Sequence, residues 1–173
     1  IATKDKVIGV LNLTSKKKRT LGGHRERVLA IATTNDSKYI LSGGNDNDLI
    51  LWEIKTGNIV NIFKGHSGAI AAIAISPDGK YAVSGGFDSS VRLWDLESKK
   101  QLGSLFDANY DYISELAYSA DGKKLFATFD KDILVWDFES MQRGKLTEIP
   151  YGVNAVDFSP DNKKILTGGY DGI

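Results

Sequence analysis

The sequence predicts an all-β protein built from a repeat of about 42 residues, in which each repeat is a small antiparallel sheet of four strands. The only tryptophans, Trp52, Trp94 and Trp136, follow one another at intervals of 42 residues (94 − 52 and 136 − 94). Each interval contains four short stretches of strand character separated by turn residues, which is the pattern of a small antiparallel sheet. An aspartate also stands six residues before each tryptophan, namely Asp46, Asp88 and Asp130.

The elements are clearest in residues 65–106. Ile70–Ile75 is apolar at every position, which predicts a first strand that is buried on both faces. Pro77 presets φ and Gly79 tolerates positive φ, so a turn is expected at residues 76–79. The remaining expected elements are a strand at 81–84, a turn containing Gly85 and Gly86, a strand at 91–96 that carries Trp94, and a strand at 101–106.

The same plan divides the whole chain. We expect an incomplete repeat at residues 1–22, full repeats at 23–64 and 65–106, a divergent repeat at 107–147 and an incomplete repeat at 148–173. The divergent repeat has Asn109 where a histidine is expected. Its segment 127–130 is one residue shorter and offers no clear counterpart to Ser84.

Composition narrows the function classes. Of 173 residues, 42% are hydrophobic and 25% are charged, which suits one compact domain. Lys plus Arg equals Asp plus Glu at 22 each, so the whole chain has no electrostatic reason to seek nucleic acid or an acidic membrane. The absence of cysteine favours a reducing compartment, and we therefore expect an intracellular protein of the cytoplasm or nucleus.

These features resemble the WD-repeat (WD40) family over essentially the whole chain. The resemblance rests on the 42-residue period, on two Gly-His pairs and on two Trp-Asp dipeptides, which are Gly23-His24, Gly65-His66, Trp94-Asp95 and Trp136-Asp137. It implies a β-propeller of about four blades with four antiparallel strands each. Propellers of this family usually have seven blades, so we expect a fragment of a larger propeller of seven or eight blades. Closure by association of two copies is the alternative.

The resemblance also implies two structural hydrogen-bond tetrads, formed by His24, Ser42, Asp46 and Trp52 and by His66, Ser84, Asp88 and Trp94. Ser, His and Asp could otherwise suggest a nucleophilic triad. Recurrence of the set at a fixed spacing argues instead for a structural role, because buried polar groups must be paired. His24 and His66 are the only histidines, so no imidazole remains for catalysis or for a metal ion. We therefore predict no catalytic residues, no metal site, no cofactor and no small-molecule substrate.

In this family, the loop before the first strand and the turn before the Trp strand open on one face, called the top face. Phe87, Phe129 and Tyr170 each precede the turn aspartate of their repeat, and exposed aromatic residues at one repeated position favour a binding surface. The alternative is that these rings cover neighbouring blades. The candidate partner-binding residues are Arg25, Arg27, Asn45, Phe87, Tyr110, Tyr112, Phe129 and Tyr170.

The predicted function is a non-catalytic scaffold that binds peptides or partner domains of a multi-subunit complex on the top face. We weigh two alternatives: an accessory or regulatory propeller domain of a larger enzyme, and a subunit of a ribonucleoprotein assembly. The basic run Lys16–Arg19 could contact phosphate, but it is better explained as a solvated turn that discourages edge pairing. Neither nucleic acid nor a membrane is expected as a direct ligand.

Overall fold

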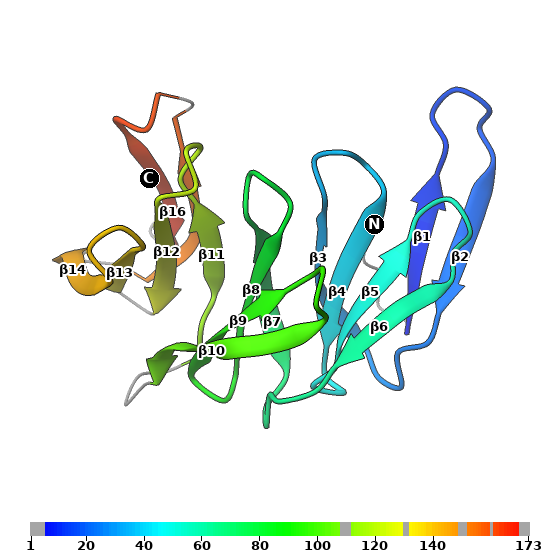
Figure 1. The fold of residues 1–173 in the computed structure, drawn as a ribbon, viewed down its shortest axis with the longest axis horizontal. Helices are drawn as coiled ribbons and strands as arrows, with labels where there is room; N and C mark the ends of the chain where they lie inside the picture. The colour runs from blue at the N-terminus through cyan, green and yellow to red at the C-terminus, as the bar shows by residue number, and fades with distance from the viewer. Residues whose placement is uncertain (1–5, 108–111, 130–131, 149–151, 160, 170–173) are drawn as a thin grey trace.

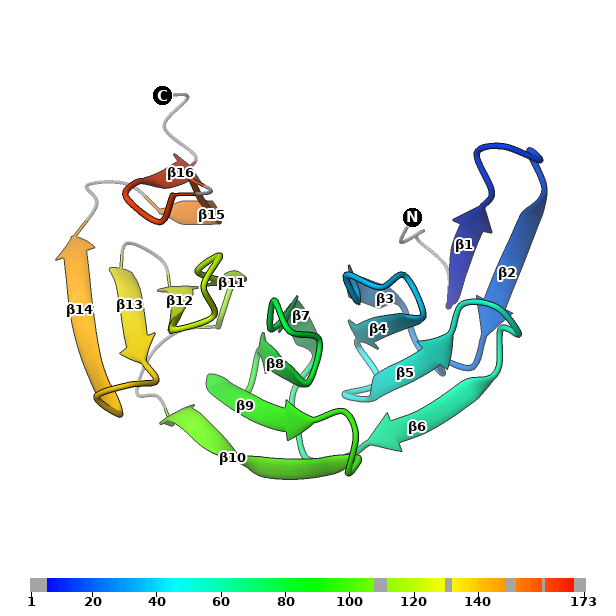
Figure 2. The same ribbon diagram turned by 45° about the horizontal axis from the view of Figure 1, so that its top comes forward.

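The computed structural model describes residues 6–107, 112–129, 132–148, 152–159 and 161–169, and these form 16 strands. The strands make five antiparallel sheets that follow one another along an arc (Figures 1 and 2). Three sheets have four strands each, and a two-stranded sheet stands at either end of the arc. The predicted all-β fold of four-stranded antiparallel sheets is confirmed. Among the described residues, no helix is long and apolar enough to cross a membrane.

The strands pair in chain order within each complete sheet. Sheet one contains β3 (Val28–Thr33), β4 (Tyr39–Gly44), β5 (Leu49–Glu53) and β6 (Ile59–Phe63). Sheet two contains β7 (Ile70–Ile75), β8 (Tyr81–Gly86), β9 (Ser90–Asp95) and β10 (Lys100–Asp107). Sheet three contains β11 (Glu115–Tyr118), β12 (Lys124–Phe129), β13 (Asp132–Asp137) and β14 (Gln142–Glu148).

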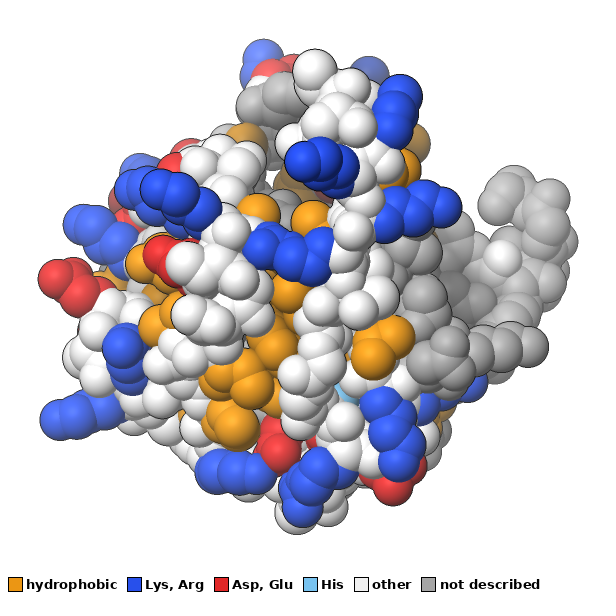
Figure 3. Space-filling model, turned by 90° about the vertical axis from the view of Figure 1, so that its right-hand side faces the viewer, with side chains coloured by type: hydrophobic (Ala, Val, Ile, Leu, Met, Phe, Trp, Pro, Cys, Tyr) orange, Lys and Arg blue, Asp and Glu red, His pale blue; other side chains and the backbone are white. Residues whose placement is uncertain are grey.

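The two end sheets correspond to different halves of the repeat unit. The N-terminal sheet contains β1 (Val7–Leu11) and β2 (Lys18–Gly22), and the C-terminal sheet contains β15 (Val153–Phe158) and β16 (Ile165–Gly169). By their place in the 42-residue repeat, β1 and β2 are third and fourth strands, whereas β15 and β16 are first and second strands. The side of the molecule that carries β1 and β2 shows a band of hydrophobic side chains flanked by Lys and Arg (Figure 3).

The hydrophobic core lies between successive sheets. The first strand of each complete sheet is on the inside of the arc and the fourth is on the outside (Figure 2). β3 packs beside β7, β7 beside β11, and β11 beside β15. Each tryptophan of sheets one and two packs toward the preceding sheet: Trp52 lies against Ile8 and Leu21, and Trp94 lies against Leu49 and Phe63. Each sheet therefore depends on a neighbouring sheet to bury its apolar faces.

The turn between the first and second strands repeats the same hydrogen bonds in all four sheets that contain these strands. A Ser or Thr hydroxyl donates to the aspartate two residues later at 2.6 Å, in the pairs Thr34–Asp36, Ser76–Asp78, Ser119–Asp121 and Ser159–Asp161. The same aspartate accepts the backbone N–H two residues further on, for example Lys80 N–H to Asp78 at 3.0 Å. The turn predicted at residues 76–79 is confirmed, and local side-chain capping explains the sequence of all four turns.

Gly85 and Gly86 do not lie in a turn, contrary to the prediction, and neither does the equivalent pair of sheet one. Gly43 and Gly44 end β4, and Gly85 and Gly86 end β8. A Cβ at Gly85 would lie 2.7 Å from Ile113 Cγ2 of the next sheet, and a Cβ at Gly86 would lie 2.0 Å from the carbonyl oxygen of Ala69. Glycine is therefore required here because neighbouring strands and sheets approach closely, and not because the backbone makes a turn.

Candidate functional site

The two faces of the arc are distinguished by the connections that they carry. The bottom face carries the turns β3–β4, β7–β8 and β11–β12, which point upward in Figure 1. The top face, on the opposite side, carries the segments that lead into β3, β7 and β11 and the turns β4–β5 and β8–β9. The two tetrads join these top-face segments to the sheets.

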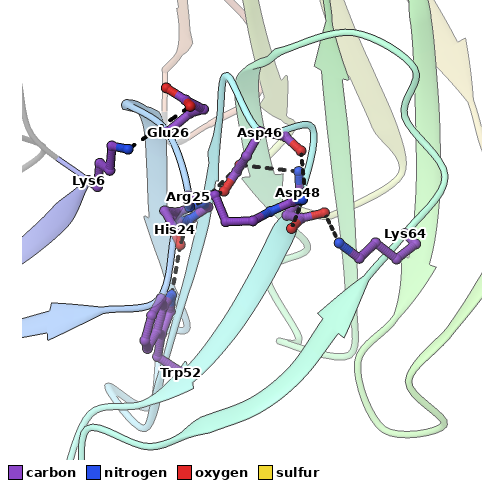
Figure 4. A network of polar contacts seen from close by, with 9 residues as sticks. Lys6, His24, Arg25, Glu26, Asp46, Asp48, Trp52 and Lys64 are labelled. Carbon is purple, nitrogen blue, oxygen red and sulfur yellow. Dashed lines mark hydrogen bonds and ion pairs between the residues drawn. The ribbon is translucent and has the colours of Figure 1, made fainter.

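In sheet one, the structure brings all four predicted tetrad residues into one chain of hydrogen bonds. Trp52 Nε1–H donates to Ser42 Oγ at 2.7 Å, and Ser42 Oγ lies 2.7 Å from His24 Nε2. His24 Nδ1 lies 2.9 Å from Asp46 Oδ2, which also accepts the backbone N–H of Arg25 at 2.8 Å. The chain therefore runs from β5 through β4 to the loop before β3 (Figure 4).

Sheet two repeats this arrangement. Trp94 Nε1–H donates to Ser84 Oγ at 2.8 Å, Ser84 Oγ lies 2.7 Å from His66 Nε2, and His66 Nδ1 lies 2.8 Å from Asp88 Oδ2. Burial lowers the pKa of His66 against the opposing effect of Asp88, so the imidazole is neutral at pH 7. A neutral ring with its proton on Nδ1 donates to Asp88 and accepts from the Ser84 hydroxyl, which satisfies every group in the chain.

The aspartate charge in the tetrads is stabilised by hydrogen bonds rather than by solvent. Burial opposes ionisation of Asp46, but hydrogen bonds from the backbone N–H of Arg25 and from His24 outweigh the effect of burial and hold the pKa of Asp46 below its usual range. Both imidazoles have fully buried side chains. A buried imidazole with both nitrogens engaged cannot reach a substrate as a general base, because such a base must contact the reacting group. The arrangement is suited to holding loops on sheets.

Sheet three has alanine at the serine position. Leu125 pairs with Trp136 as Ala82 pairs with Trp94, so Ala127 occupies the place of Ser84. The hairpin between β12 and β13 is one residue shorter than its counterpart, which hid this equivalence at the level of sequence. Asn109 and Asp130 lie outside the described residues.

The same deletion makes the prediction for Phe129 wrong. We expected Phe129 on the exposed top face beside the turn, by its distance from Trp136. In the structure it is the last residue of β12, at the place of Gly86, and is only 2% exposed. Its ring belongs to the core between sheets two and three, together with Val91, Ile113 and Leu134. Phe129 is therefore a core residue and is removed from the candidate site.

An ion-pair network holds Arg25 on the top face of sheet one. Arg25 Nη2 lies 3.3 Å from Asp48 Oδ2 and donates to the carbonyl oxygen of Asp46 at 3.3 Å. Lys64 Nζ pairs with the other oxygen of Asp48 (Figure 4). The Asp48 carboxylate is mostly buried, whereas Arg25 and Lys64 are mostly exposed, so the acid positions two cations at the surface.

Asp48 and Lys64 were not predicted from the sequence. A weak signal did exist, because a polar residue stands four positions before every tryptophan, as Asp48, Ser90 and Asp132. Ser90 and Asp132 also bond to side chains, Ser90 to Asp88 and Asp132 to Lys145. The cations around Asp48 come from two separate loops, the one before β3 and the one after β6, and could not be inferred from spacing.

An exposed aromatic pair lies where sheets two and three meet on the top face. Phe87, in the turn after β8, and Tyr112, in the segment before β11, stack with ring centroids 4.9 Å apart and an interplanar angle of 9°. Phe87 is 56% exposed and Tyr112 is 41% exposed. Backbone bonds position the pair: Phe87 N–H donates to Ala69 O at 2.9 Å, and Ile113 N–H donates to Gly86 O at 3.3 Å.

The other candidate residues divide into two groups. Arg27 and Asn45 are exposed at the top of sheet one, where Asn45 N–H donates to the Arg27 carbonyl at 2.9 Å. Tyr110 and Tyr170 lie outside the described residues. Among the residues that the structure places, no group of three or more His, Cys, Asp or Glu side chains is arranged to hold a metal ion.

Comparison with known families agrees with the repeat. The sequence profile of the family described as WD domain, G-beta repeat matches residues 15–53, 57–95, 99–137 and 144–173. The four matches cover most of the chain, and the first three begin 42 residues apart, which is the period set by the tryptophans.

Known proteins with similar sequences extend this finding. The rice (Oryza sativa subsp. japonica) protein named small ribosomal subunit protein RACK1y is 37% identical over an alignment of 140 positions, which covers 76% of this chain and 41% of that protein. The cross-pathway control WD-repeat protein 2 of Flammulina velutipes is 39% identical over an alignment of 185 positions, gaps included, which covers 99% of this chain and 58% of that protein. The general transcriptional corepressor TUP1 of Saccharomyces cerevisiae is 47% identical over 36 residues, which are 21% of this chain and 5% of that protein. The chain therefore spans about half the length of the rice and Flammulina velutipes proteins.

Proposed function

Because the chain belongs to the WD domain, G-beta repeat family, we propose that it is a non-catalytic scaffold that binds a peptide segment or partner domain through its top face. The observation that carries this proposal is the stacked and exposed pair of Phe87 and Tyr112. Aromatic rings exposed together on a rigid support are the residue type that dominates binding energy at protein interfaces. A soluble fold gains nothing from exposing such a pair to water.

The polar surroundings of the top face support a protein partner. Arg25 is fixed by Asp48 with its guanidinium exposed, and Arg27 and Asn45 lie beside it on the surface. Arginine is enriched at interfaces together with tyrosine, and a positioned guanidinium loses little entropy on binding. The full burial of both imidazoles in tetrads supports the absence of acid–base chemistry.

The names of relatives support membership of a larger complex. One relative is named a small ribosomal subunit protein and another a general transcriptional corepressor. We extend from these names the proposal that this chain works with other proteins in a multi-subunit assembly, in the cytoplasm or nucleus. The top-face residues proposed for this role are Arg25, Arg27, Asn45, Phe87 and Tyr112, with Tyr110 and Tyr170 added from the sequence.

Substitution of the aromatic pair tests the proposal. In the double variant Phe87→Ala, Tyr112→Ala, a purified partner identified by wild-type capture should bind about 30-fold or more weakly, as expected for hot-spot residues, with little change in Tm. Isothermal titration and thermal melts measure the two quantities. Met141→Ala, which removes an exposed side chain from a turn on the bottom face, is the control and should bind normally.

Phe129→Ala supplies the opposite control. Its ring is buried, so the variant should lose about 3–5 kcal/mol of stability. Below its melting temperature it should still bind the partner. Equal partner affinity of the wild type and the Phe87, Tyr112 double variant would contradict the top-face proposal.

A ribonucleoprotein role is the second candidate, and the name of the rice relative favours it. The basic run lies in the turn before β2 and at its start, where Lys16, Lys17 and Lys18 are exposed. Arg19 instead donates to the carbonyl oxygen of Lys55 at 3.0 Å. If the run contacts RNA, the affinity should fall steeply with salt and fall further in a Lys16, Lys17, Lys18 to Ala variant. If the protein does not bind RNA at low salt, the ribonucleoprotein role is excluded.

A further inference from the structure

A hollow of the molecule lies on the bottom face, between sheets two and three. It has a volume of about 500 Å³, within the usual range of ligand pockets of about 300–1,000 Å³. Its walls carry Tyr81 and Leu102 from sheet two and Tyr118 and Phe138 from sheet three. We call these four residues and the space between them the bottom groove. The aromatic pair on the top face contributes nothing to it.

The bottom groove is open because of particular substitutions in the repeat. The equivalent hollow between sheets one and two has a volume of only about 210 Å³. There, Asn35 Nδ2–H bridges the two sheets by donating to the carbonyl oxygen of Pro77 at 2.8 Å. Pro77 itself occupies the place of Asn35 in sheet two, and its side chain has no donor with which to form the same bridge.

The floor of the bottom groove is aromatic. Tyr118 and Phe138 stack with centroids 5.8 Å apart and an interplanar angle of 16°. The corresponding residues of sheet two, by strand register and turn position, are Ile75 and Leu96. Burial raises the pKa of Tyr118, and the Asp78 carboxylate adds to the rise, so the phenol stays neutral.

The exposed apolar wall and the charges at the rim indicate which kind of ligand the groove would bind. Leu102 is 53% exposed and Tyr81 is 38% exposed. Asp78 and Asp121 stand at the rim, and the described residues that line the groove include no Lys or Arg. Hydrogen bonds from the Ser76 hydroxyl and the Lys80 amide lower the pKa of Asp78, and the equivalent bonds from Ser119 and Lys123 lower the pKa of Asp121. Both rim carboxylates are therefore charged at neutral pH.

We infer that the bottom groove binds a short peptide segment of another protein, which inserts an aromatic or aliphatic side chain against Tyr118, Phe138 and Leu102 and presents Lys or Arg to Asp78 and Asp121. The apolar anchor supplies the binding energy by leaving water. The basic neighbours select the partner through charge complementarity. This surface is separate from the top face, so the protein can bridge two partners on opposite faces of one sheet pair.

A selection experiment tests the ligand chemistry. A displayed library of random ten-residue peptides is selected on the full-length protein, and the enriched peptides are then measured by fluorescence anisotropy. The inference expects sequences with one aromatic or aliphatic residue flanked by Lys or Arg. Enrichment of acidic sequences, or no enrichment above an unrelated protein, overturns it.

Variants of the groove locate the binding. Leu102→Glu should weaken the enriched peptides at least tenfold, since it places a charge on the apolar wall. The double variant Asp78→Asn, Asp121→Asn keeps the oxygen that accepts the turn hydrogen bonds and removes both charges, and should weaken binding about 5- to 10-fold. Asp36→Asn is the matched control, because it makes the same change in the same turn beside the smaller hollow.

The outcomes separate this inference from the top-face proposal. Phe87→Ala, Tyr112→Ala should bind the enriched peptides as well as the wild type does, and Leu102→Glu should keep its affinity for a top-face partner. Peptide binding that survives Leu102→Glu, or that Asp36→Asn weakens equally, overturns the inference. Sedimentation in which wild-type protein self-associates and Leu102→Glu does not would show that a second copy covers the groove, which overturns it as well.

Discussion

At the scale of single residues, the tetrads depend on the directional matching of donors and acceptors. Trp94 can only donate, Asp88 can only accept, and Ser84 and His66 can do both, so protons along this chain have one satisfactory arrangement. Each group is buried, and loss of one partner would leave another unsatisfied at a cost of about 1–3 kcal/mol. The stability of the network therefore depends on the charge of its imidazole, because a protonated His66 could no longer accept a hydrogen bond from Ser84.

Stability should therefore fall when the pH decreases from 7.5 to 5. The folded-state pKa of His66 lies below its usual value of 6.5, so the unfolded chain takes up this proton more readily than the folded chain. Stability from the neutral ring is complete above pH 6.5 and declines as the pH falls below it. The lowered pKa of Asp88 acts in the same direction at lower pH, with stability lost as the pH falls below 3.8.

Urea denaturation at several pH values measures this dependence. His66→Gln should be less stable than the wild type at pH 7.5, and its stability should change less between pH 7.5 and 5. A variant whose loss of stability over this range equals that of the wild type would contradict the role given to His66.

At the scale of strands and sheets, glycine controls how closely neighbours pack. The ends of β4 and β8 approach the following sheet so closely that a side chain has no room. A Cβ at Gly43 would lie 2.5 Å from Ile70 Cγ2, and one at Gly85 would lie 2.7 Å from Ile113 Cγ2. In sheet three, Thr128 pairs with Ile133 at the position equivalent to Gly85, so this tight contact is not repeated there.

Gly85→Ala should destabilise the protein by about 1–3 kcal/mol, because overpacking forces Ile113 and its strand to shift. Gly103→Ala is the control in another strand of the same sheet, since a Cβ there meets no atom within 4 Å. That variant should be neutral or more stable by about 0.5 kcal/mol through the loss of unfolded-state entropy. Chemical denaturation of both variants makes the comparison, and similar effects in the two would refute the packing argument.

At the scale of the whole molecule, stability is shared between neighbours along the arc. Each complete sheet buries one face against the sheet before it and the other against the sheet after it. The C-terminal sheet has two strands in the described residues, and every position of β16 is exposed or half-buried. Two-stranded sheets are only marginally stable in water, so local opening should be easiest there.

Hydrogen exchange of the 173-residue chain should rank the strands accordingly. Amides of β4 and β8, the second strands of sheets one and two, should exchange slowest, and those of β16 should exchange at least tenfold faster. Mass spectrometry of peptic fragments after exchange at neutral pH gives both rates. Equal protection of β8 and β16 would mean that the sheets open as one cooperative unit.

The sequence alone determined the repeat, the four strands of each sheet and the capped turns, and its resemblance to the WD-repeat family implied the eight residues of the two tetrads. Strand alternation, turn chemistry and recurrence at 42 residues are local properties, and they are written in each repeat separately. In the third repeat, these local patterns did not predict the positions of individual residues correctly. One missing residue moves Phe129 from the expected surface into the core and puts Ala127 in the place of a serine.

Only the tertiary structure decided which residues of different loops and sheets meet. The Asp48 network, the stack of Phe87 on Tyr112 and the bottom groove each join side chains from two loops or two sheets. The glycine pairs likewise follow from contacts with the next strand or sheet, which no local pattern records. Packing between repeats depends on the volumes on both sides of an interface, so the period predicts that an interface exists but not what it leaves exposed.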